Sequence, residues 1–146
     1  MSFPGHMKIL MANGTYKPIS NLRVNDTVLC YAPDGHLTTD IITRFIPNQG
    51  SGYDIVEFAD GTMLVTIGKQ RIYDIAAERF RNITDWEKND KAYNYLGHSA
   101  ALEKLSHLAS PASFYSFFTE KYNNYFVNGI WCGNYFASTT INPLNT

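Results

Sequence analysis

Asn134 closes the apolar stretch NNYFVNGIWCGN, and an asparagine in this place has two possible uses. Its side-chain nitrogen can attack the carbonyl of its own residue, which breaks the chain after it. Asparagine is also common where strands end, because its side chain forms hydrogen bonds with the local backbone. Both interpretations stay open from this stretch alone.

The two cysteines and four histidines of the chain show no spacing typical of a metal site. Cys30 and Cys132 each lie in an apolar run, VLCYA and GIWCG, and we expect two buried free thiols. The histidines are expected at the surface, because no metal-ligand spacing links them: His6, His36, His98 and His107. We expect neither a metal nor an organic cofactor.

Length and composition are those of one globular domain. The chain has 146 residues, of which 45% are hydrophobic and 17% are charged. The formal net charge is −1, so nothing in the charge balance favours nucleic acid as a partner. No apolar run reaches transmembrane length, and the N-terminal MSFPGHMK lacks the pattern of a signal peptide. We expect a monomer that binds neither membranes nor nucleic acid.

Four Asx-Gly dipeptides divide much of the chain into strand-like runs. Such pairs adopt positive φ at low cost, as a tight hairpin turn requires. The aromatic content, with 10 Tyr and 9 Phe, also favours sheets. The sequence therefore predicts an all-β body with hairpins at four places: Asn13-Gly14, Asp34-Gly35, Asp60-Gly61 and Asn128-Gly129.

Residues 75–112 interrupt this pattern, and we interpret them as a partly helical insertion. The stretch SAALEKLSHLA begins with Ser99, a suitable N-cap. Leu102, Leu105 and Leu108 follow at a spacing that places them on one face of a helix. The sequence therefore predicts a short helix here.

Three segments, in this order, resemble the conserved blocks of the Hint superfamily, the self-processing domains of Hedgehog proteins and inteins. They read SFPGHMKILMANGTYKPISNLRVNDTVLCY, DGTMLVTIGKQRIYD and FYSFFTEKYNNYFVNGIWCGN. The resemblance extends over about residues 2–74 and 114–134. The resemblance implies an all-β, horseshoe-like Hint fold for residues 1–134, with residues 135–146 as the start of a C-terminal flank or linker.

The resemblance assigns the N-terminal chemistry to three residues. Ser2 stands where the family usually has cysteine, the nucleophile that attacks the preceding carbonyl, and an alcohol is the weaker nucleophile near neutral pH. Thr66 matches the threonine of the second block. Lys69 stands where that block has histidine. We expect Thr66 and Lys69 to help with the oxyanion and with proton transfer.

The resemblance assigns the C-terminal chemistry to Asn134, which would form a succinimide and cut the chain. Asn123 falls where an assisting histidine is expected and would be a polar support, while Gly133 replaces the penultimate histidine. Splicing needs a hydroxyl or thiol after the asparagine, and Tyr135 has neither a thiol nor an aliphatic hydroxyl. Ligation of the flanks is therefore not expected.

We predict an intein-like domain for autocatalytic cleavage or splicing of a larger precursor, with attenuated or lost chemistry. Its only partner and substrate would be its own flanking polypeptide, so it would be self-processing and not a turnover enzyme. A non-catalytic Hint-like structural or interaction module is the alternative, favoured by the missing histidines. A third possibility is an unrelated β-rich domain that binds a ligand through aromatic residues: Tyr115, Phe117, Phe118, Tyr122, Tyr125 and Phe126.

Overall fold

The computed structural model describes residues 2–95, 97–138 and 141–143, and the regular elements in this part of the chain are β-strands and two 3₁₀ turns. The strands of the first half are β1 (Phe3–Pro4), β2 (Lys8–Leu10), β3 (Tyr16–Pro18), β4 (Thr27–Tyr31), β5 (Leu37–Gly50), β6 (Tyr53–Phe58) and β7 (Met63–Thr66). Those of the second half are β8 (Arg71–Asp74), β9 (Arg79–Asn82), β10 (Lys91–Tyr93), β11 (Ser99–Leu108), β12 (Ala112–Thr119), β13 (Asn124–Val127) and β14 (Ile130–Gly133). The 3₁₀ turns are η1 (Ile19–Asn21) and η2 (Ile83–Asp85).

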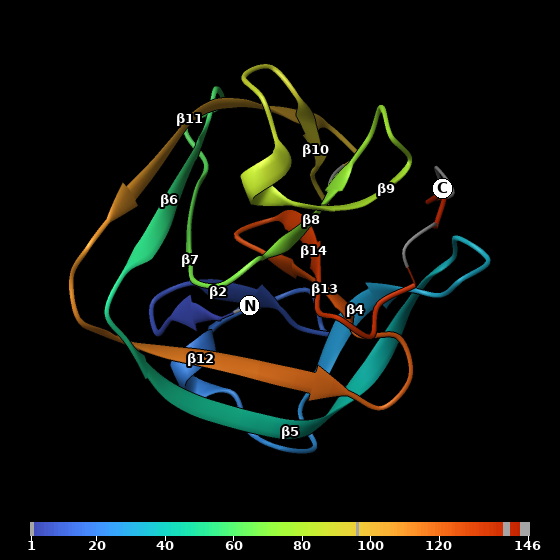
Figure 1. Cartoon of the computed structure of the whole chain (residues 1–146). Helices are drawn as coiled ribbons and strands as arrows, with labels where there is room; N and C mark the ends of the chain where they lie inside the picture. The colour runs from blue at the N-terminus through green and yellow to red at the C-terminus, as the bar shows by residue number, and fades with distance from the viewer. Residues whose placement is uncertain (1, 96, 139–140, 144–146) are drawn as a thin grey trace.

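The strands form two antiparallel sheets that curl around one central hairpin (Figure 1). The smaller sheet has the order β1-β12-β5-β4. The larger has the order β3-β2-β13-β14-β8-β10-β11-β6-β7, with β9 paired to β8. Figure 1 shows β5 and β12 as one long ribbon below the centre, and β6 and β11 as another at the left. The predicted all-β class is confirmed.

Each predicted Asx-Gly turn lies at the tip of a hairpin. These hairpins are β2–β3, β4–β5, β6–β7 and β13–β14. At the last of them both turn residues have positive φ, 49° for Asn128 and 86° for Gly129, as a two-residue primed turn requires. Local turn chemistry thus sets the register of the central hairpin, in which Val127 faces Ile130.

The central hairpin β13–β14 is buried on both faces. Because strand side chains alternate, Tyr125 and Cys132 point into the main core, while Phe126 and Trp131 point to the other side. That other side holds a second cluster, here called the aromatic core: Leu10, Leu29, Tyr31, Tyr73, Phe80, Phe126, Trp131, Ala137 and Ile141. The ring of Trp131 lies 4.4 Å from that of Tyr73 and 4.8 Å from that of Phe80, between centroids.

The predicted helical insertion is wrong. Ser99–Leu108 is the strand β11, paired with β10 and β6. In the part of residues 75–112 that the structure describes, the only helical element is the 3₁₀ turn η2. Differences in helix propensity are worth about 0.5 kcal/mol per residue. Burial of Ala100 and Leu102 on one strand face, together with the ladder to β6, outweighs it. Leu105 and Leu108, expected to line the buried face of a helix, are exposed.

Both cysteines lie in the interior, as predicted. Burial raises the pKa of the Cys30 thiol to about 12 and that of Cys132 further, so neither is a thiolate near neutral pH. Within the described residues, no helix is long and apolar enough to span a membrane. No group of His, Cys, Asp and Glu in the same residues could hold a metal ion.

Candidate functional site

Ser2 lies where β1 begins, and it is buried against the end of β7. Its N–H donates to the carbonyl of Ile67 at 3.2 Å, and the N–H of Ile67 donates back to the carbonyl of Ser2 at 2.9 Å. Thr66 is fully buried, and its hydroxyl also donates to the Ser2 carbonyl, at 2.9 Å. Thr66 therefore fixes the backbone of Ser2. The carbonyl that Ser2 would attack belongs to residue 1, which lies outside the described residues.

Asn134 is buried just beyond β14, and its side chain is held at both ends. The amide nitrogen donates to Oδ1 of Asn123 at 3.0 Å and to the carbonyl of Phe117 at 3.4 Å. The amide oxygen accepts the N–H of Phe136 at 2.9 Å. Because a backbone N–H can only donate, this last bond fixes which end of the amide is the oxygen.

Asn123 is placed beside Asn134 by its backbone conformation. Its φ of 54° is a left-handed value that asparagine tolerates better than most residues. Oδ1 of Asn123 also accepts the N–H of Thr119 at 2.8 Å, and the N–H of Asn123 donates to the Thr119 hydroxyl at 2.8 Å. The predicted site residues Asn123 and Asn134 are therefore in contact.

Gln70 is a site residue that the sequence analysis missed. It is fully buried, and its amide nitrogen donates to the carbonyl of Gly133 at 3.1 Å and to that of Arg71 at 3.0 Å. Its amide oxygen is buried without a partner among the described residues. Gln70 thus connects the Thr66 side of the site to the residue before Asn134. Strand alternation could have found it, because Gln70 shares a face with the buried Ile72.

Tyr125 is a buried, protonated phenol beside Gln70. Complete burial raises its pKa far above the usual value, and the nearby Cys132 raises it further, while a hydrogen bond with Gln70 opposes the shift. A phenol of this kind can donate a proton in a hydrogen bond, but it is not a base near neutral pH.

Lys69 and the four histidines lie at the surface. Lys69 is exposed in the turn between β7 and β8. All four histidines are exposed as well. His36 and His107 contact the carboxylates of Asp34 and Asp54 at 3.1 and 3.0 Å. The structure therefore does not bring Lys69 into the buried group formed by Thr66, Gln70, Asn123 and Asn134.

The position of the missing penultimate histidine is filled by other atoms. A Cβ added at Gly133 would lie 2.8 Å from the Cβ of Ala137 and 3.4 Å from the ring of Phe80. The N–H of Ala137 donates to the carbonyl of Asn134 at 3.1 Å. This carbonyl is the one that a succinimide reaction would attack.

The six aromatic residues proposed as a ligand-binding surface do not form an exposed surface. Phe117, Tyr125 and Phe126 are buried, and Tyr115, Phe118 and Tyr122 are half-buried. These six rings serve mainly as core.

The fold is similar to that of solved inteins, which confirms the predicted Hint-type fold class. The bacterial intein-like domain from Clostridium thermocellum has 18% sequence identity and a TM-score of 0.83, and the match covers 91% of this chain and 98% of that one. The DnaB intein from Synechocystis sp. PCC 6803 has 12% identity and a TM-score of 0.78, over 94% and 98% of the two chains. The gp41-1 intein has 14% identity and a TM-score of 0.75, over 91% and 98%.

These likenesses are in structure, and at such identities they show the fold alone. No model of a protein family matches the sequence, and no curated protein matches it either. The intein-like architecture thus stands on the three-dimensional comparison.

Proposed function

We propose that this chain is an intein-like self-processing module that slowly cuts its own backbone after Asn134. One observation carries the proposal: the buried Asn134 amide has its nitrogen on Asn123, while its own carbonyl accepts the N–H of Ala137. A surface asparagine that merely ends a strand needs neither the burial nor the two contacts.

The reaction would be an internal transfer at one carbonyl carbon. The amide nitrogen of Asn134 attacks that carbon and loses a proton, and the bond to the nitrogen of Tyr135 breaks. That nitrogen gains a proton and becomes a new amino terminus, while Asn134 becomes a C-terminal succinimide. The N–H of Ala137 supports the oxygen on which negative charge develops, and Asn123 orients the attacking nitrogen.

The cleavage should be slow because the described residues place no acid beside the leaving nitrogen. Gly133 offers no imidazole, and an amide such as Asn123 or Gln70 does not donate a proton to an amine. General acid–base assistance contributes roughly 10²- to 10⁴-fold, and this factor would be missing.

The same proposal gives Ser2 the N-terminal step, attack of its hydroxyl on the preceding carbonyl, with Thr66 as the group that positions it. Lys69 would transfer protons from the solvent side. The only substrate in this scheme is the flanking polypeptide of the same chain. The domain would act as a monomer without a cofactor.

The test is the intact mass of the purified chain over days at neutral pH. We expect slow loss of residues 135–146 and a product that ends in a succinimide or in Asn134. Asn134→Ala should abolish this product, while Asn48→Ala, a change at an exposed asparagine of β5, should leave it unchanged. A parent chain as stable as Asn134→Ala would contradict the proposal.

The second candidate is a non-catalytic module with the same fold. It is favoured by the exposure of all four histidines and by the filled space beside Gly133. In that case Asn134, Asn123 and Phe136 form a structural turn that ends the last strand, and the mass experiment distinguishes the two functions.

A further inference from the structure

The segment that follows Asn134 packs into the domain at several points. Ala137 is 5% exposed and Ile141 is 2% exposed, and both belong to the aromatic core. Asn142 accepts a hydrogen bond from the hydroxyl of Tyr73 at 3.4 Å. A linker with the composition YFASTTINPLNT would be expected to stay in solvent, so these three contacts need an explanation.

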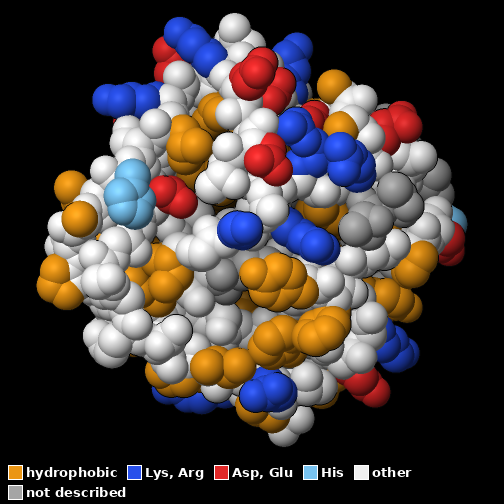
Figure 2. All heavy atoms as spheres, viewed as in Figure 1, with side chains coloured by type: hydrophobic (Ala, Val, Ile, Leu, Met, Phe, Trp, Pro, Cys, Tyr) orange, Lys and Arg blue, Asp and Glu red, His pale blue; other side chains and the backbone are white. Residues whose placement is uncertain are grey.

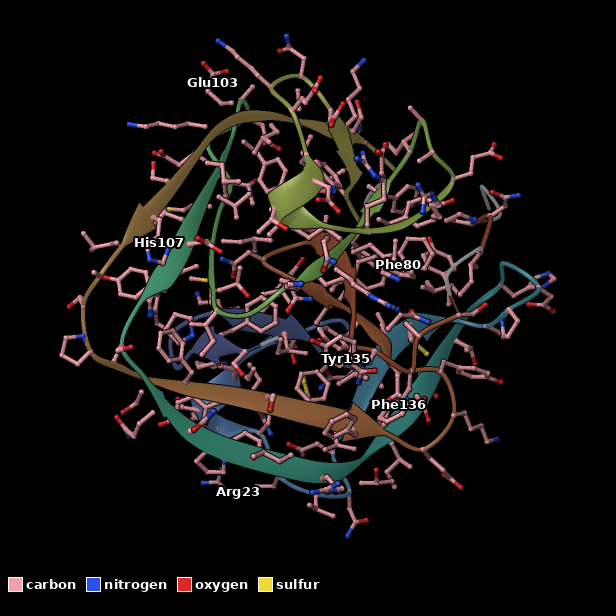
Figure 3. The ribbon with its side chains drawn as sticks, in the orientation of Figure 1. Arg23, Phe80, Glu103, His107, Tyr135 and Phe136 are labelled. Atoms are coloured by element: carbon pink, nitrogen blue, oxygen red, sulfur yellow. The ribbon has the colours of Figure 1, made fainter. Side chains whose placement is uncertain are left out.

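The two exposed side chains of the segment also have partners. Tyr135 and Phe136 are 59% and 69% exposed. The guanidinium of Arg71 lies 5.6 Å from the ring centre of Tyr135, and the ring of Phe118 lies 5.5 Å from that of Phe136. Figure 3 shows Tyr135 and Phe136 next to each other in front of β12, and Figure 2 shows apolar surface at the same place, bordered by basic side chains.

The absence of a side chain at Gly133 makes room for Ala137. The added Cβ at 2.8 Å from the Cβ of Ala137 would be closer than real Cβ atoms come, and Phe80 closes the other side. Gly133 and Ala137 are therefore complementary: one must be glycine for the other to enter.

From these contacts we infer that the domain has a binding groove for its own C-terminal flank, formed by Gly133, Phe80, Trp131 and Tyr73 and occupied by residues 135–138 and 141–142. The groove selects a small residue at the third position after the cleavage site and an apolar residue at the seventh. That residues 135–146 are a flank to be cut off rests on the proposed function, whereas the fit of these residues to the groove does not depend on cleavage.

The groove also explains the departure from the Hint pattern at Gly133. A histidine here would displace Ala137, and with it the N–H that supports the Asn134 carbonyl. Gly133→His alone should therefore displace residues 135–138 from the groove, and this displacement should outweigh the help that an imidazole gives to the reaction.

A double-mutant cycle tests the complementarity, with Gly133→Ala, Ala137→Gly and the pair of changes. Gly133→Ala alone should lower Tm by about 5 °C, because of the overpacked contact. It should also speed hydrogen exchange at the N–H groups of Phe136 and Ala137 by roughly tenfold, with exchange in β13 unchanged. In the Ala137→Gly background both effects should fall to less than about half.

Two matched controls accompany the cycle. Gly52→Ala places a Cβ at 3.3 Å from the exposed His107 ring, which can move, and should leave the exchange of Phe136 and Ala137 unchanged. Ile141→Ser should release the flank in the same way as Gly133→Ala, whereas Val24→Ser, at a half-exposed site, should not.

Additive effects of Gly133→Ala and Ala137→Gly would overturn the groove, as would fast exchange of Phe136 and Ala137 in the parent chain. These outcomes are separate from the failure of the proposed function. A chain that never cleaves can still show the coupling, and a chain that cleaves can show additive effects.

Discussion

Residues 8–42 and residues 71–102, here called the first and second units, are built alike. Each begins with a hairpin, β2–β3 or β8–β9, continues through a 3₁₀ turn, and enters a strand of the next hairpin. Each 3₁₀ turn starts with a fully buried isoleucine, Ile19 or Ile83, whose carbonyl accepts the N–H of the residue three positions on at 3.1 Å. The two units thus follow one plan.

The plan extends to the polar residues after each 3₁₀ turn. Asn25 and Asn89 have φ of 78° and 75°. The following Asp26 and Asp90 accept backbone N–H groups at 2.9 and 2.8 Å. A short sequence pattern, isoleucine followed six positions later by Asn-Asp, therefore produces the same local structure twice.

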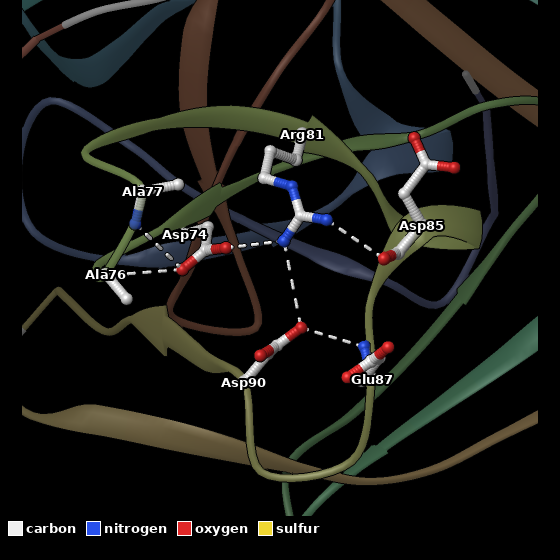
Figure 4. A network of polar contacts seen from close by, with 7 residues as sticks. All are labelled: Asp74, Ala76, Ala77, Arg81, Asp85, Glu87 and Asp90. Carbon is white, nitrogen blue, oxygen red and sulfur yellow. Dashed lines mark hydrogen bonds and ion pairs between the residues drawn. The ribbon is translucent and has the colours of Figure 1, made fainter.

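The units differ in how their charged residues are held. In the first, Lys17 makes one half-exposed ion pair with Asp26 at 3.1 Å. In the second, Arg81 contacts Asp74 at 2.7 Å, Asp90 at 3.7 Å and the carbonyl of Asp85 at 2.9 Å (Figure 4). Asp74 is buried, and it raises the pKa of Arg81.

A second difference lies in the outer strand of each hairpin. Tyr16 of β3 is 45% exposed, whereas Phe80 of β9 is 4% exposed because it packs against Trp131 in the aromatic core, which also contains Ala137. One backbone plan thus has an open face in the first unit and a covered face in the second.

The largest expected effect tests whether the units are equivalent. Ile19→Ala and Ile83→Ala each remove a fully buried side chain, and each should lower the free energy of unfolding by about 2–5 kcal/mol. Urea denaturation measures both. If one variant lost under about 1 kcal/mol and the other about 4 kcal/mol, only one 3₁₀ turn would be a structural centre of its unit.

A somewhat smaller effect should separate the units. Asp74→Asn keeps an acceptor for the N–H of Ala76 but leaves Arg81 without its closest carboxylate, and should cost about 3 kcal/mol. In the first unit, Asp26→Asn removes a half-exposed ion pair and should cost about 1 kcal/mol or less. Equal losses in urea would show that the network around Arg81 adds nothing to a single pair.

The smallest effect at neutral pH concerns Tyr73, which occupies in β8 the place that Leu10 has in β2. Burial, followed by Glu78 and Asp74, raises the pKa of its phenol from 10.0 to about 12. Below pH 10 the phenol is neutral in both the folded and the unfolded chain. Above pH 10 it ionises in the unfolded chain before it ionises in the folded one, so the free energy of unfolding should fall between pH 10 and 12.

Tyr73→Phe should make this fall shallower by up to about 1.4 kcal/mol per pH unit, and should change stability by little at pH 7. Urea denaturation at pH 7, 9 and 11 measures it. An unchanged slope above pH 10 would mean that other buried phenols, such as Tyr31, carry the alkaline sensitivity.

The turns could be predicted because their chemistry is local. Asn128-Gly129 specifies a primed turn by itself, and the hairpin around it follows. The helix expected from Ser99 could not be excluded in this way, because the strand β11 depends on pairing with β6, over 40 positions earlier in the chain. The internal repeat of the two units could not be recognised from the sequence, because its two copies share too few residue types.

The candidate site was predictable only in part. The family pattern pointed to Asn123 and Asn134, which are in contact, and to Thr66, which holds Ser2. It pointed to Lys69, which is exposed in the turn between β7 and β8, whereas the buried residue is its neighbour Gln70. Which neighbour faces inward depends on the register with other strands, and a motif does not specify that.

The long strand that leaves each unit pairs with a strand outside both units, and this affects the order of events during synthesis. β5 leaves the first unit and pairs with β12, and the paired residues are 62 to 77 positions apart in the sequence. β11 leaves the second unit and pairs with β6. Pairings this distant in sequence are slow to form, and folds rich in them take milliseconds to seconds. A ribosome that has made only the first unit holds a strand without its neighbour. The contacts around Asn134 therefore form only after almost the whole domain has been translated.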